Sequence, residues 1–374
     1  MKNRSKKLVA LFVGLSMTAS LLIGCGAKEE TKDKITTEQQ QDGAVDATED
    51  KEEVPADKEE STKVVLTDLV GNEITLDKPA TKLVGTHNPT MNTAVILGGG
   101  GKYIAGFGNK KMASGLYAYV FPELAEVTQI GKGKDINFEE CIAQGAELAI
   151  LPERFAGQAE QFKEVGIPAA VVLPNTESYE TISTSLKMVG TLVGEEERAA
   201  EIITFFESKI EEAKTITASI KESPRALYLG GSSALSVANG VMLQSVMLET
   251  VGAENVAKDV QGEGDFVEVS VEEIIGWNPE VIYVPVFAQY TVEDILNDPA
   301  WSEIDAVKEG RVYQFPSALE PWDYPTPSAA MGLTWLIQNL YPDLYTLEEV
   351  VEDANEYYEL VYGQTFTAEE LGLK

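Results

Sequence analysis

From residue 63 onward, the chain alternates short apolar runs with segments whose apolar residues recur at helical spacing. Alternation of this kind predicts a parallel β-sheet covered by helices. The expected strands are 82–85, 103–107, 148–151 and 169–173 in the first half, and 226–229, 281–284 and 311–315 in the second. The expected helices are 91–97, 137–144, 158–165, 242–251, 271–276, 292–297, 328–340 and a last one from 347. A hairpin over 64–76 precedes them.

The segment 195–222 separates the two alternating regions and contains neither Gly nor Pro. Its apolar residues fall at steps of three and four, which predicts one helix of about 42 Å. A helix of that length can join two lobes. The sequence therefore predicts an α/β chain with an N-terminal lobe (63–194), a connecting helix (195–222) and a C-terminal lobe (223–374).

The first 24 residues have the order of a secretory signal, a basic leader followed by an uncharged apolar run. The run 8–23 is shorter than the roughly 20 residues of a membrane-spanning helix. It closes with Leu22-Ile23-Gly24-Cys25, which resembles the bacterial lipoprotein cleavage box. The resemblance implies removal of residues 1–24 and acylation of Cys25. The alternative is an ordinary signal or anchor that happens to contain a cysteine.

Residues 25–62 are rich in acidic and small polar side chains and almost lack large apolar ones. Such a segment cannot bury enough surface to fold, so we expect an extended tether. An interaction tail is the alternative.

Charge and composition exclude several function classes. The chain has 61 acidic and 29 basic residues, a net charge of −32. This excess opposes binding to nucleic acid and electrostatic recruitment to anionic lipid. One histidine and two cysteines are too few for most zinc sites, iron–sulfur clusters or disulfide frameworks. We therefore expect an acidic, extracytoplasmic protein without a resident metal or cofactor, anchored to the cell membrane through Cys25.

Two stretches resemble a known family. The segment 136–139 precedes the strand 148–151, and the segment 269–272 precedes Trp277-Asn278-Pro279-Glu280 and another strand. Together they resemble the substrate-binding proteins of bacterial ABC importers for iron-siderophore, haem and vitamin B12. The resemblance implies two Rossmann-like lobes joined by one rigid helix, a ligand cleft between them, and no enzymatic activity.

The same resemblance implies a role for one glutamate in each stretch. In the family, these glutamates dock onto arginines of the permease, which places Glu139 and Glu272 in that role. The alternative is that both are ordinary acids in the first turn of a helix, where the helix dipole favours them.

Candidate ligand-binding residues lie where strands end, because ligands of parallel sheets bind beyond the carboxyl ends of the strands. These residues are His87, Asn88, Tyr117, Arg154, Ser232, Trp322 and Tyr324. His87 offers a metal ligand or a hydrogen bond, Arg154 a partner for an anionic group, and Trp322 with Tyr324 a flat aromatic face. The alternatives are a helix cap for His87, a solvated Arg154, and packing between lobes for the aromatic pair.

The resemblance implies an iron(III) chelate of siderophore type as the first candidate ligand, with cobalamin or haem behind it. A small oxyanion such as molybdate stays open, because helix N-termini bind anions. The sequence shows no basic cluster for a strongly anionic catecholate, which favours a neutral or weakly charged chelate. A lipid-anchored hydrolase is a remote alternative, since Gly230-Gly231-Ser232-Ser233 lacks the usual nucleophile turn. The expected partners are an ABC permease and its ATPase, with the protein itself a monomer.

Overall fold

The computed structural model describes residues 63–108, 114–262 and 266–373. The predicted signal segment, Cys25 and the acidic tether lie outside this part of the chain. No helix within it is long and apolar enough to cross a membrane.

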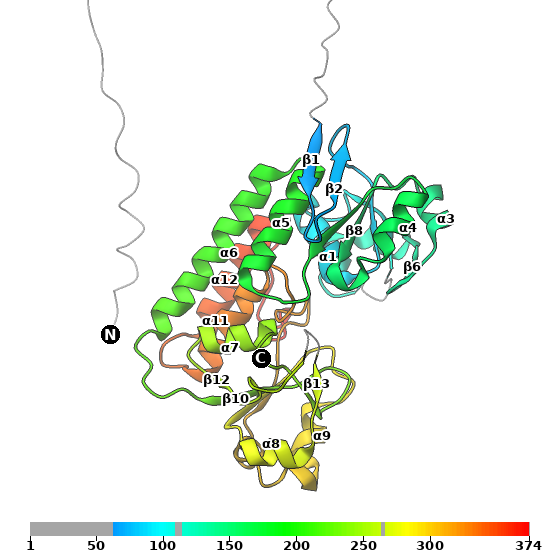
Figure 1. Cartoon of the computed structure of the whole chain (residues 1–374). Coiled ribbons are helices and arrows are strands. Elements are labelled where there is room, and N and C mark those ends of the chain that lie inside the picture. Colours follow the sequence, from blue (N-terminus) through cyan, green and yellow to red (C-terminus); the bar gives the residue numbers. More distant parts are fainter. Residues whose placement is uncertain (1–62, 109–113, 263–265, 374) are drawn as a thin grey trace, which may run out of the picture. The chain divides into compact units, whose positions relative to one another are not determined.

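The N-terminal lobe is built on a five-stranded sheet whose neighbouring strands are all parallel (Figure 1). The strand order is β5 (Thr128–Gln129), β4 (Ile104–Phe107), β3 (Leu83–Gly85), β8 (Leu148–Pro152) and β9 (Ala169–Leu173). The main helices are α1 (Asn88–Gly98), α3 (Phe138–Ala143), α4 (Gln158–Glu164) and α5 (Tyr179–Val193). Strands β8 and β9 are buried at every position, as expected for a sheet covered on both faces.

The C-terminal lobe repeats this plan with four parallel strands. Their order is β12 (Glu254–Asn255), β10 (Arg225–Tyr228), β14 (Val281–Val284) and β15 (Val312–Gln314). Its helices are α7 (Leu243–Thr250), α8 (Val271–Trp277), α9 (Val292–Asn297), α10 (Asp305–Lys308), α11 (Ala329–Leu340) and α12 (Leu347–Tyr362). The predicted α/β architecture with two parallel sheets is therefore confirmed.

Three antiparallel pairs and one short helix complete the fold. The pairs are β1 (Val64–Thr67) with β2 (Glu73–Leu76), β6 (Gly131–Lys132) with β7 (Asp135–Ile136), and β11 (Ser236–Val237) with β13 (Val267–Glu268). The short helix is α2 (Tyr117–Val120). Asp68, in the turn after β1, accepts a hydrogen bond from the Val171 amide of β9, which fastens the predicted hairpin to the edge strand of the sheet.

The long helix α6 spans Glu196–Thr217, so it ends five residues before the predicted end at 222. At about 1.5 Å per residue its length is about 33 Å. It lies beside α5 on one side and α11 and α12 on the other (Figure 1). Helix α5 was not among the predicted elements, although Ser178 caps it through the Thr181 amide.

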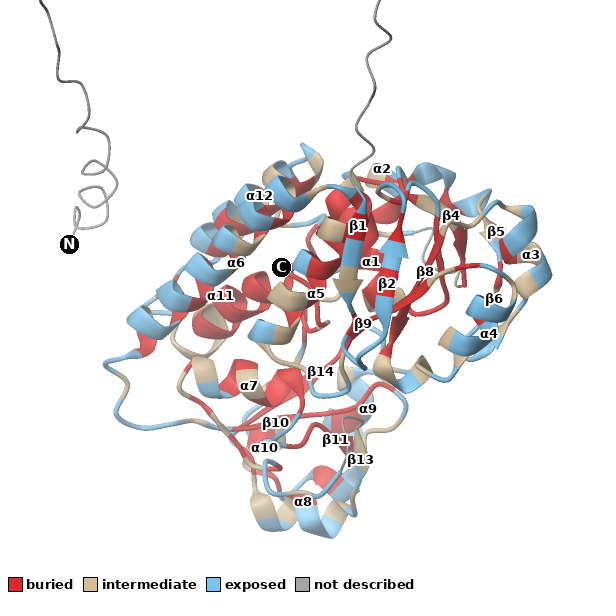
Figure 2. Cartoon of the chain, turned by 45° about the horizontal axis from the view of Figure 1, so that its top comes forward, coloured by how far each residue is buried: buried red, intermediate tan, exposed pale blue. Residues whose placement is uncertain are grey.

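The buried side chains form three clusters. One cluster lies within the outer part of the N-terminal lobe and a second within the outer part of the C-terminal lobe. The largest cluster contains residues of both lobes and of α6. Figure 2 shows α11 buried along most of its length in this shared cluster. The lobes are thus held together by a common core and not by the connecting helix alone.

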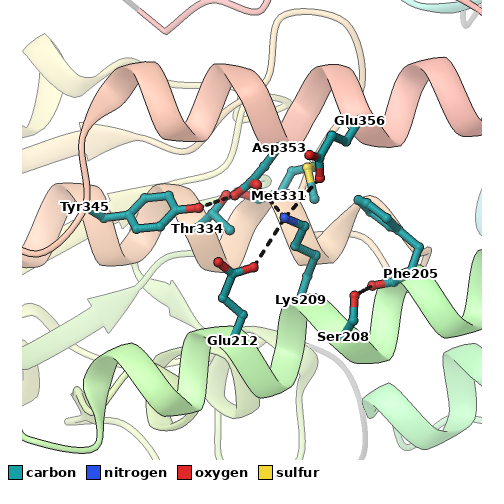
Figure 3. A network of polar contacts seen from close by, with 9 residues as sticks. All are labelled: Phe205, Ser208, Lys209, Glu212, Met331, Thr334, Tyr345, Asp353 and Glu356. Carbon is teal, nitrogen blue, oxygen red and sulfur yellow. Dashed lines mark hydrogen bonds and ion pairs between the residues drawn. The ribbon is translucent and has the colours of Figure 1, made fainter. Parts of the chain in front are cut away.

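A buried ion-pair cluster joins α6 to α12 (Figure 3). Lys209 lies on the buried stripe of α6, and its Nζ is 2.5 Å from Asp353 Oδ1 of α12. Glu212 and Glu356 approach the same ammonium group at 3.3 and 3.2 Å. The Tyr345 hydroxyl donates to the second oxygen of Asp353. Both buried charges are therefore paired, as burial requires.

Candidate functional site

A cavity of about 740 Å³ lies between the two lobes. It is bordered by the ends of β3 and β8, the first turn of α1, the β6–β7 hairpin, the start of α7 and the loop before α11. Its lining residues are Thr86, His87, Asn88, Pro89, Gly108, Gln129, Lys132, Gly133, Arg154, Phe155, Glu177, Met242, Gln244, Phe266, Phe287, Asp323, Tyr324 and Pro325. Most of these positions follow the carboxyl ends of strands, where the sequence predicts the ligand.

The turn between β3 and α1 brings a helix N-terminus to the cavity. His87 is the N-cap residue with extended backbone, and Pro89 stands in the first helical turn, a position where its missing N–H costs nothing. The Thr86 hydroxyl donates to the Gly133 carbonyl at 2.6 Å, which holds the β6–β7 hairpin against the site. Gly108 is required here, because a Cβ atom on it would lie 2.6 Å from Thr86 Cα.

His87 and Arg154 form the polar contact at the centre of the N-terminal side. The Arg154 guanidinium is 2.6 Å from His87 Nε2. Burial, and secondly the Arg154 charge, lower the pKa of His87 to about 3, so the ring is neutral at pH 7. Its Nε2 then accepts from Arg154, and its Nδ1–H points to the Thr90 hydroxyl at 3.4 Å. The neutral ring thereby orients the guanidinium at the rim of the cavity.

The positive groups of the cavity lie on the N-terminal side. Arg154 and Lys132 border it there together with the N-terminal end of α1. Helix N-termini and guanidinium groups both favour anionic oxygens. This side of the cavity suits the oxygen-rich face of a chelate or an oxyanion.

The C-terminal side carries buried acceptor groups. Asp323 is fully buried, and its Oδ2 accepts from the Tyr228 hydroxyl at 2.7 Å. Burial raises the pKa of Asp323 to about 6, although the Tyr228 hydrogen bond opposes the rise. Gln244 Nε2 donates to the Asp323 carbonyl at 2.9 Å. Asp323 Oδ1 and Gln244 Oε1 are buried without a hydrogen-bond partner.

A side chamber of about 300 Å³ adjoins the main cavity. The two share Asn88, Phe287 and Tyr324, and the rings of Phe287 and Tyr324 lie 5.4 Å apart. The rest of its lining is Asn92, Ser114, Gly115, Leu116, Tyr117, Ala318, Leu319, Glu320, Pro321 and Thr326. The side chains of Phe287 and Tyr324 therefore stand where the two spaces adjoin.

The structure brings five of the seven predicted ligand residues to these spaces. His87, Asn88, Arg154 and Tyr324 border the main cavity, and Tyr117 borders the side chamber. Ser232 is exposed and lines neither space.

The structure corrects the prediction that Trp322 and Tyr324 together offer an aromatic face to a ligand. Its side chain is fully buried, and its Nε1 donates to the Tyr358 hydroxyl at 2.9 Å. The ring therefore packs against α12 and offers no face to a ligand. Tyr324 alone of the pair reaches the cavity, with Phe287 as its aromatic neighbour.

Several lining residues were not identified from the sequence. Gln244 and Asn92 are buried polar residues on helices, and each interrupts an otherwise apolar face. A polar residue on an apolar helix face was the sequence signal that could have identified Gln244 and Asn92 as lining residues. Lys132 and Gly133 reach the site through the β6–β7 hairpin, whose two-residue strands are too short to give a pattern.

The two proposed docking glutamates have closely matched surroundings. Glu139 and Glu272 are exposed residues in the first turns of α3 and α8. The next acid in each helix is engaged: Glu140 accepts from Gln144, and Glu273 caps its own helix through Ser270. Within the described residues, Glu139 and Glu272 have no hydrogen bond or ion pair, so both carboxylates face solvent unengaged. Glu348 of α12 has the same local geometry as Glu272.

No group of three or more His, Cys, Asp or Glu side chains that could hold a metal ion occurs in the described ranges. The residues that line the cavity offer hydrogen bonds, charge and aromatic rings to a ligand.

Comparison with known proteins agrees with this geometry. Residues 92–319 match the family profile of the periplasmic binding proteins. The Molybdate-binding protein MolA of Haemophilus influenzae is 26% identical over 327 residues, covering 81% of this chain and 92% of that protein. The uncharacterized ABC transporter substrate-binding lipoprotein YvrC of Bacillus subtilis is 24% identical over 350 residues, covering 91% of this chain and 99% of that protein.

A solved structure matches at the level of the fold. The periplasmic solute binding protein from Veillonella parvula superimposes with a TM-score of 0.73 and 26% sequence identity. The alignment covers 82% of this chain and 95% of that chain.

Proposed function

Because the chain belongs to the periplasmic binding protein family, whose members bind solutes for ABC importers and are not enzymes, we propose that it captures an iron(III) chelate of siderophore type and delivers it to a permease. The observation that carries the ligand class is the size of the cavity between the lobes. Its volume of about 740 Å³, with about 300 Å³ more in the side chamber, falls in the range of sites for drug-sized ligands.

The charge of the lining supports a chelate of low net charge. Arg154 and Lys132 are balanced by Glu177 and Asp323 among the described residues around the main cavity. A strongly anionic tricatecholate would meet too few cations here. Hydroxamate complexes, which are neutral or singly charged, fit this balance, and cobalamin or haem remain candidates by size.

Molybdate is the second candidate. It is favoured by the similarity to a protein named for molybdate binding and by the meeting of Arg154 with the N-terminus of α1. An oxyanion of five heavy atoms would occupy a small part of the cavity, since one water takes about 30 Å³. It also has no hydrogen-bond donor for the buried oxygens of Asp323 and Gln244.

A thermal-melting panel tests this assignment. The purified protein would be melted with ferric hydroxamates, ferric catecholates, haem, cobalamin and molybdate. A ligand at about 100 times its dissociation constant adds about 2.7 kcal/mol to stability. We expect the ferric hydroxamates to shift the melt. Arg154→Gln should weaken their binding at least tenfold and Lys214→Gln, on the exposed face of α6, should not. A shift with molybdate alone would reject the iron-chelate assignment in favour of the second candidate.

Docking to the permease is the second part of the proposal. The exposed, unengaged carboxylates of Glu139 and Glu272, one on each lobe, suit two fixed arginines on a partner, because Arg–carboxylate pairs give geometric specificity. The acidic surface of the chain would also speed encounter with a basic face.

Charge reversal tests the docking role. The double variant Glu139→Lys/Glu272→Lys should abolish cellular uptake of the best-binding compound of the panel and leave its affinity within twofold. Glu348→Lys is the matched control, because this residue has the helix position of Glu272, and its uptake should stay normal. Equal cellular uptake by the double variant and by the Glu348→Lys control would contradict the docking role of Glu139 and Glu272.

We also propose that Cys25 carries the lipid anchor, with support from the cleavage box and from the relative that is named a lipoprotein. Mass spectrometry of the mature protein should find acyl chains on Cys25, and Cys25→Ser should lack them. An unmodified Cys25 in the mature protein would disprove lipidation at this residue.

A further inference from the structure

The side chamber collects buried oxygen atoms that have no partner. Asn92 Oδ1, Glu320 Oε1 and Asn88 Oδ1 all lack a hydrogen bond, and all three residues line the chamber. Asn92 and Glu320 are 6% and 7% exposed. Buried polar atoms in folded proteins are nearly always bonded, and leaving one unpaired costs about 1–3 kcal/mol. Three acceptors in one space therefore indicate a donor that the ligand supplies.

Glu320 is the ionisable member of this set. It stands in the loop before α11, and the Tyr358 hydroxyl of α12 bonds its carboxyl group. Burial raises the pKa of Glu320 to about 8 in spite of that hydrogen bond. Burial thus disfavours the ionised carboxylate, and a positive group beside it would favour that form.

The other groups facing Glu320 do not provide that positive charge. They are Tyr117 of α2, Tyr324 of its own loop, and Tyr357, Tyr358 and Tyr362 of α12. Burial raises the pKa of each of these hydroxyls above the ordinary value of 10. Asp323, on the same loop, borders the main cavity and titrates near 6. No lysine, arginine or histidine lines the chamber among the described residues.

We propose that the side chamber binds a primary ammonium group, with Glu320, Asn92 and Asn88 as its acceptors. An ammonium group has three N–H donors, which matches three unpaired acceptors. The source is a terminal amine on an arm of the chelate held in the main cavity, which passes Phe287 and Tyr324, or a free alkylamine. The first source rests on the proposed function and names its substrate class: a weakly charged iron(III) chelate with an amine-bearing arm.

The geometry divides the site by polarity. Arg154, Lys132 and the α1 N-terminus attract oxygens of the chelate at one end. The acceptors of the side chamber attract a donor at the other. A ligand with both features is held in one orientation, which a single charged pocket would not impose.

A pair of matched ligands tests the proposal on the intact protein. The probes are ferrioxamine B, a linear ferric trihydroxamate with one terminal primary amine, and its analogue with methyl in place of the ammonium group. We expect the amine form to bind at least tenfold more tightly by calorimetry at pH 8. In Glu320→Gln the two should bind within twofold of each other, and in Asp323→Asn the tenfold preference should persist. Equal binding of both probes to the unmodified protein overturns the proposal and leaves the chelate function standing.

A second arm covers the case in which neither hydroxamate binds, which would be a failure of the proposed function. The melting temperature is then measured with n-butylamine and with n-butanol at constant ionic strength. Stabilisation by the amine alone, lost in Glu320→Gln, supports the ammonium site with a free amine as its occupant. Absence of that stabilisation overturns the proposal.

Discussion

Two buried polar clusters of this protein are built in opposite ways. Around Lys209, between α6 and α12, one ammonium group meets three carboxylates, and a tyrosine hydroxyl covers the remaining oxygen of Asp353. Around Glu320, between α1 and the loop before α11, acceptor oxygens are buried without donors. Lys209 and Asp353 are buried, as are Asn92 and Glu320, yet only the first cluster is complete.

The difference separates a cluster that stabilises the fold from one that we propose binds a ligand. A fully paired network stabilises one arrangement of helices. An unpaired one reduces stability until a complementary group arrives. Among the described residues, the unpaired buried atoms of Asn88, Asn92, Gln244, Glu320 and Asp323 belong to side chains that line the two spaces, which is where we propose that the ligand binds.

Breaking the paired cluster should give the largest effect. Lys209→Met removes the positive charge and leaves the Asp353 carboxylate buried with the Tyr345 hydroxyl as its hydrogen-bond partner but no counter-charge, which should lower the free energy of unfolding by about 3–5 kcal/mol. Chemical denaturation at pH 7 measures the loss. Ligand affinity of the folded fraction should not change, because Lys209 is remote from both cavities.

A surface ion pair provides the control for this variant. Lys214 and Glu211 form a pair on the same helix, with both side chains more than half exposed. Lys214→Met should therefore cost no more than about 0.5 kcal/mol. Similar losses of unfolding free energy in Lys209→Met and Lys214→Met would show that burial does not make the Lys209 cluster more important for stability than a surface ion pair.

Two buried asparagines sharpen the comparison. Asn255 is fully bonded: its Nδ2 donates to Ala238 O and Ser245 Oγ, and its Oδ1 accepts from the Ala257 amide. Asn92 makes one bond, to the Tyr117 hydroxyl at 2.9 Å, and has an unpaired oxygen. Asn255→Leu should cost at least about 2 kcal/mol, and Asn92→Leu less than about 1 kcal/mol.

For ligand binding, the order of the two variants should be reversed: Asn92→Leu should have the larger effect and Asn255→Leu the smaller. Calorimetry with the best compound of the panel should show weaker binding to Asn92→Leu and unchanged binding to Asn255→Leu. An equal loss of stability in both variants would mean that Asn92, like Asn255, serves to stabilise the fold.

The last comparison concerns the pH dependence of stability. The folded pKa of Glu320, about 8, exceeds its ordinary value of 4.5, so the folded state holds the proton more tightly than the unfolded state. Its contribution to stability is therefore fully present below pH 4.5 and is lost as pH rises toward 8, by about 1.4 kcal/mol per pH unit. Glu320→Gln should lack this slope, as measured by denaturation between pH 5 and 8. Parallel curves for the two proteins would contradict the assignment.

The sequence predicted the sheets well because buried parallel strands are nearly continuous apolar runs. Strands such as β8 and β14 fall within one residue of the expected ranges. Helix α5 could have been predicted from Ser178 and the apolar spacing of Ile182, Leu186 and Val189. The end of α6 could not, since apolar residues at helical spacing continue to Ile220 beyond its last turn.

The site was predictable in its N-terminal half and less so in its C-terminal half. His87, Asn88 and Arg154 directly follow strands, so topology alone places them at the cleft. The loop at 320–324 has no such constraint. Whether Trp322 or Tyr324 faces the ligand is decided by the tyrosines of α12, which lie more than thirty residues further along the chain.

The core shared by both lobes constrains how this protein unfolds and how its binding specificity can change. Because the largest cluster of buried side chains draws on α1, α5, α6, α11 and α12 together, neither lobe has an interior that it can complete alone. Heating should produce one cooperative calorimetric transition instead of two. A new binding specificity therefore has to arise by substitution of cleft residues, since exchange of a whole lobe with a relative would cut through the interior on which both halves depend.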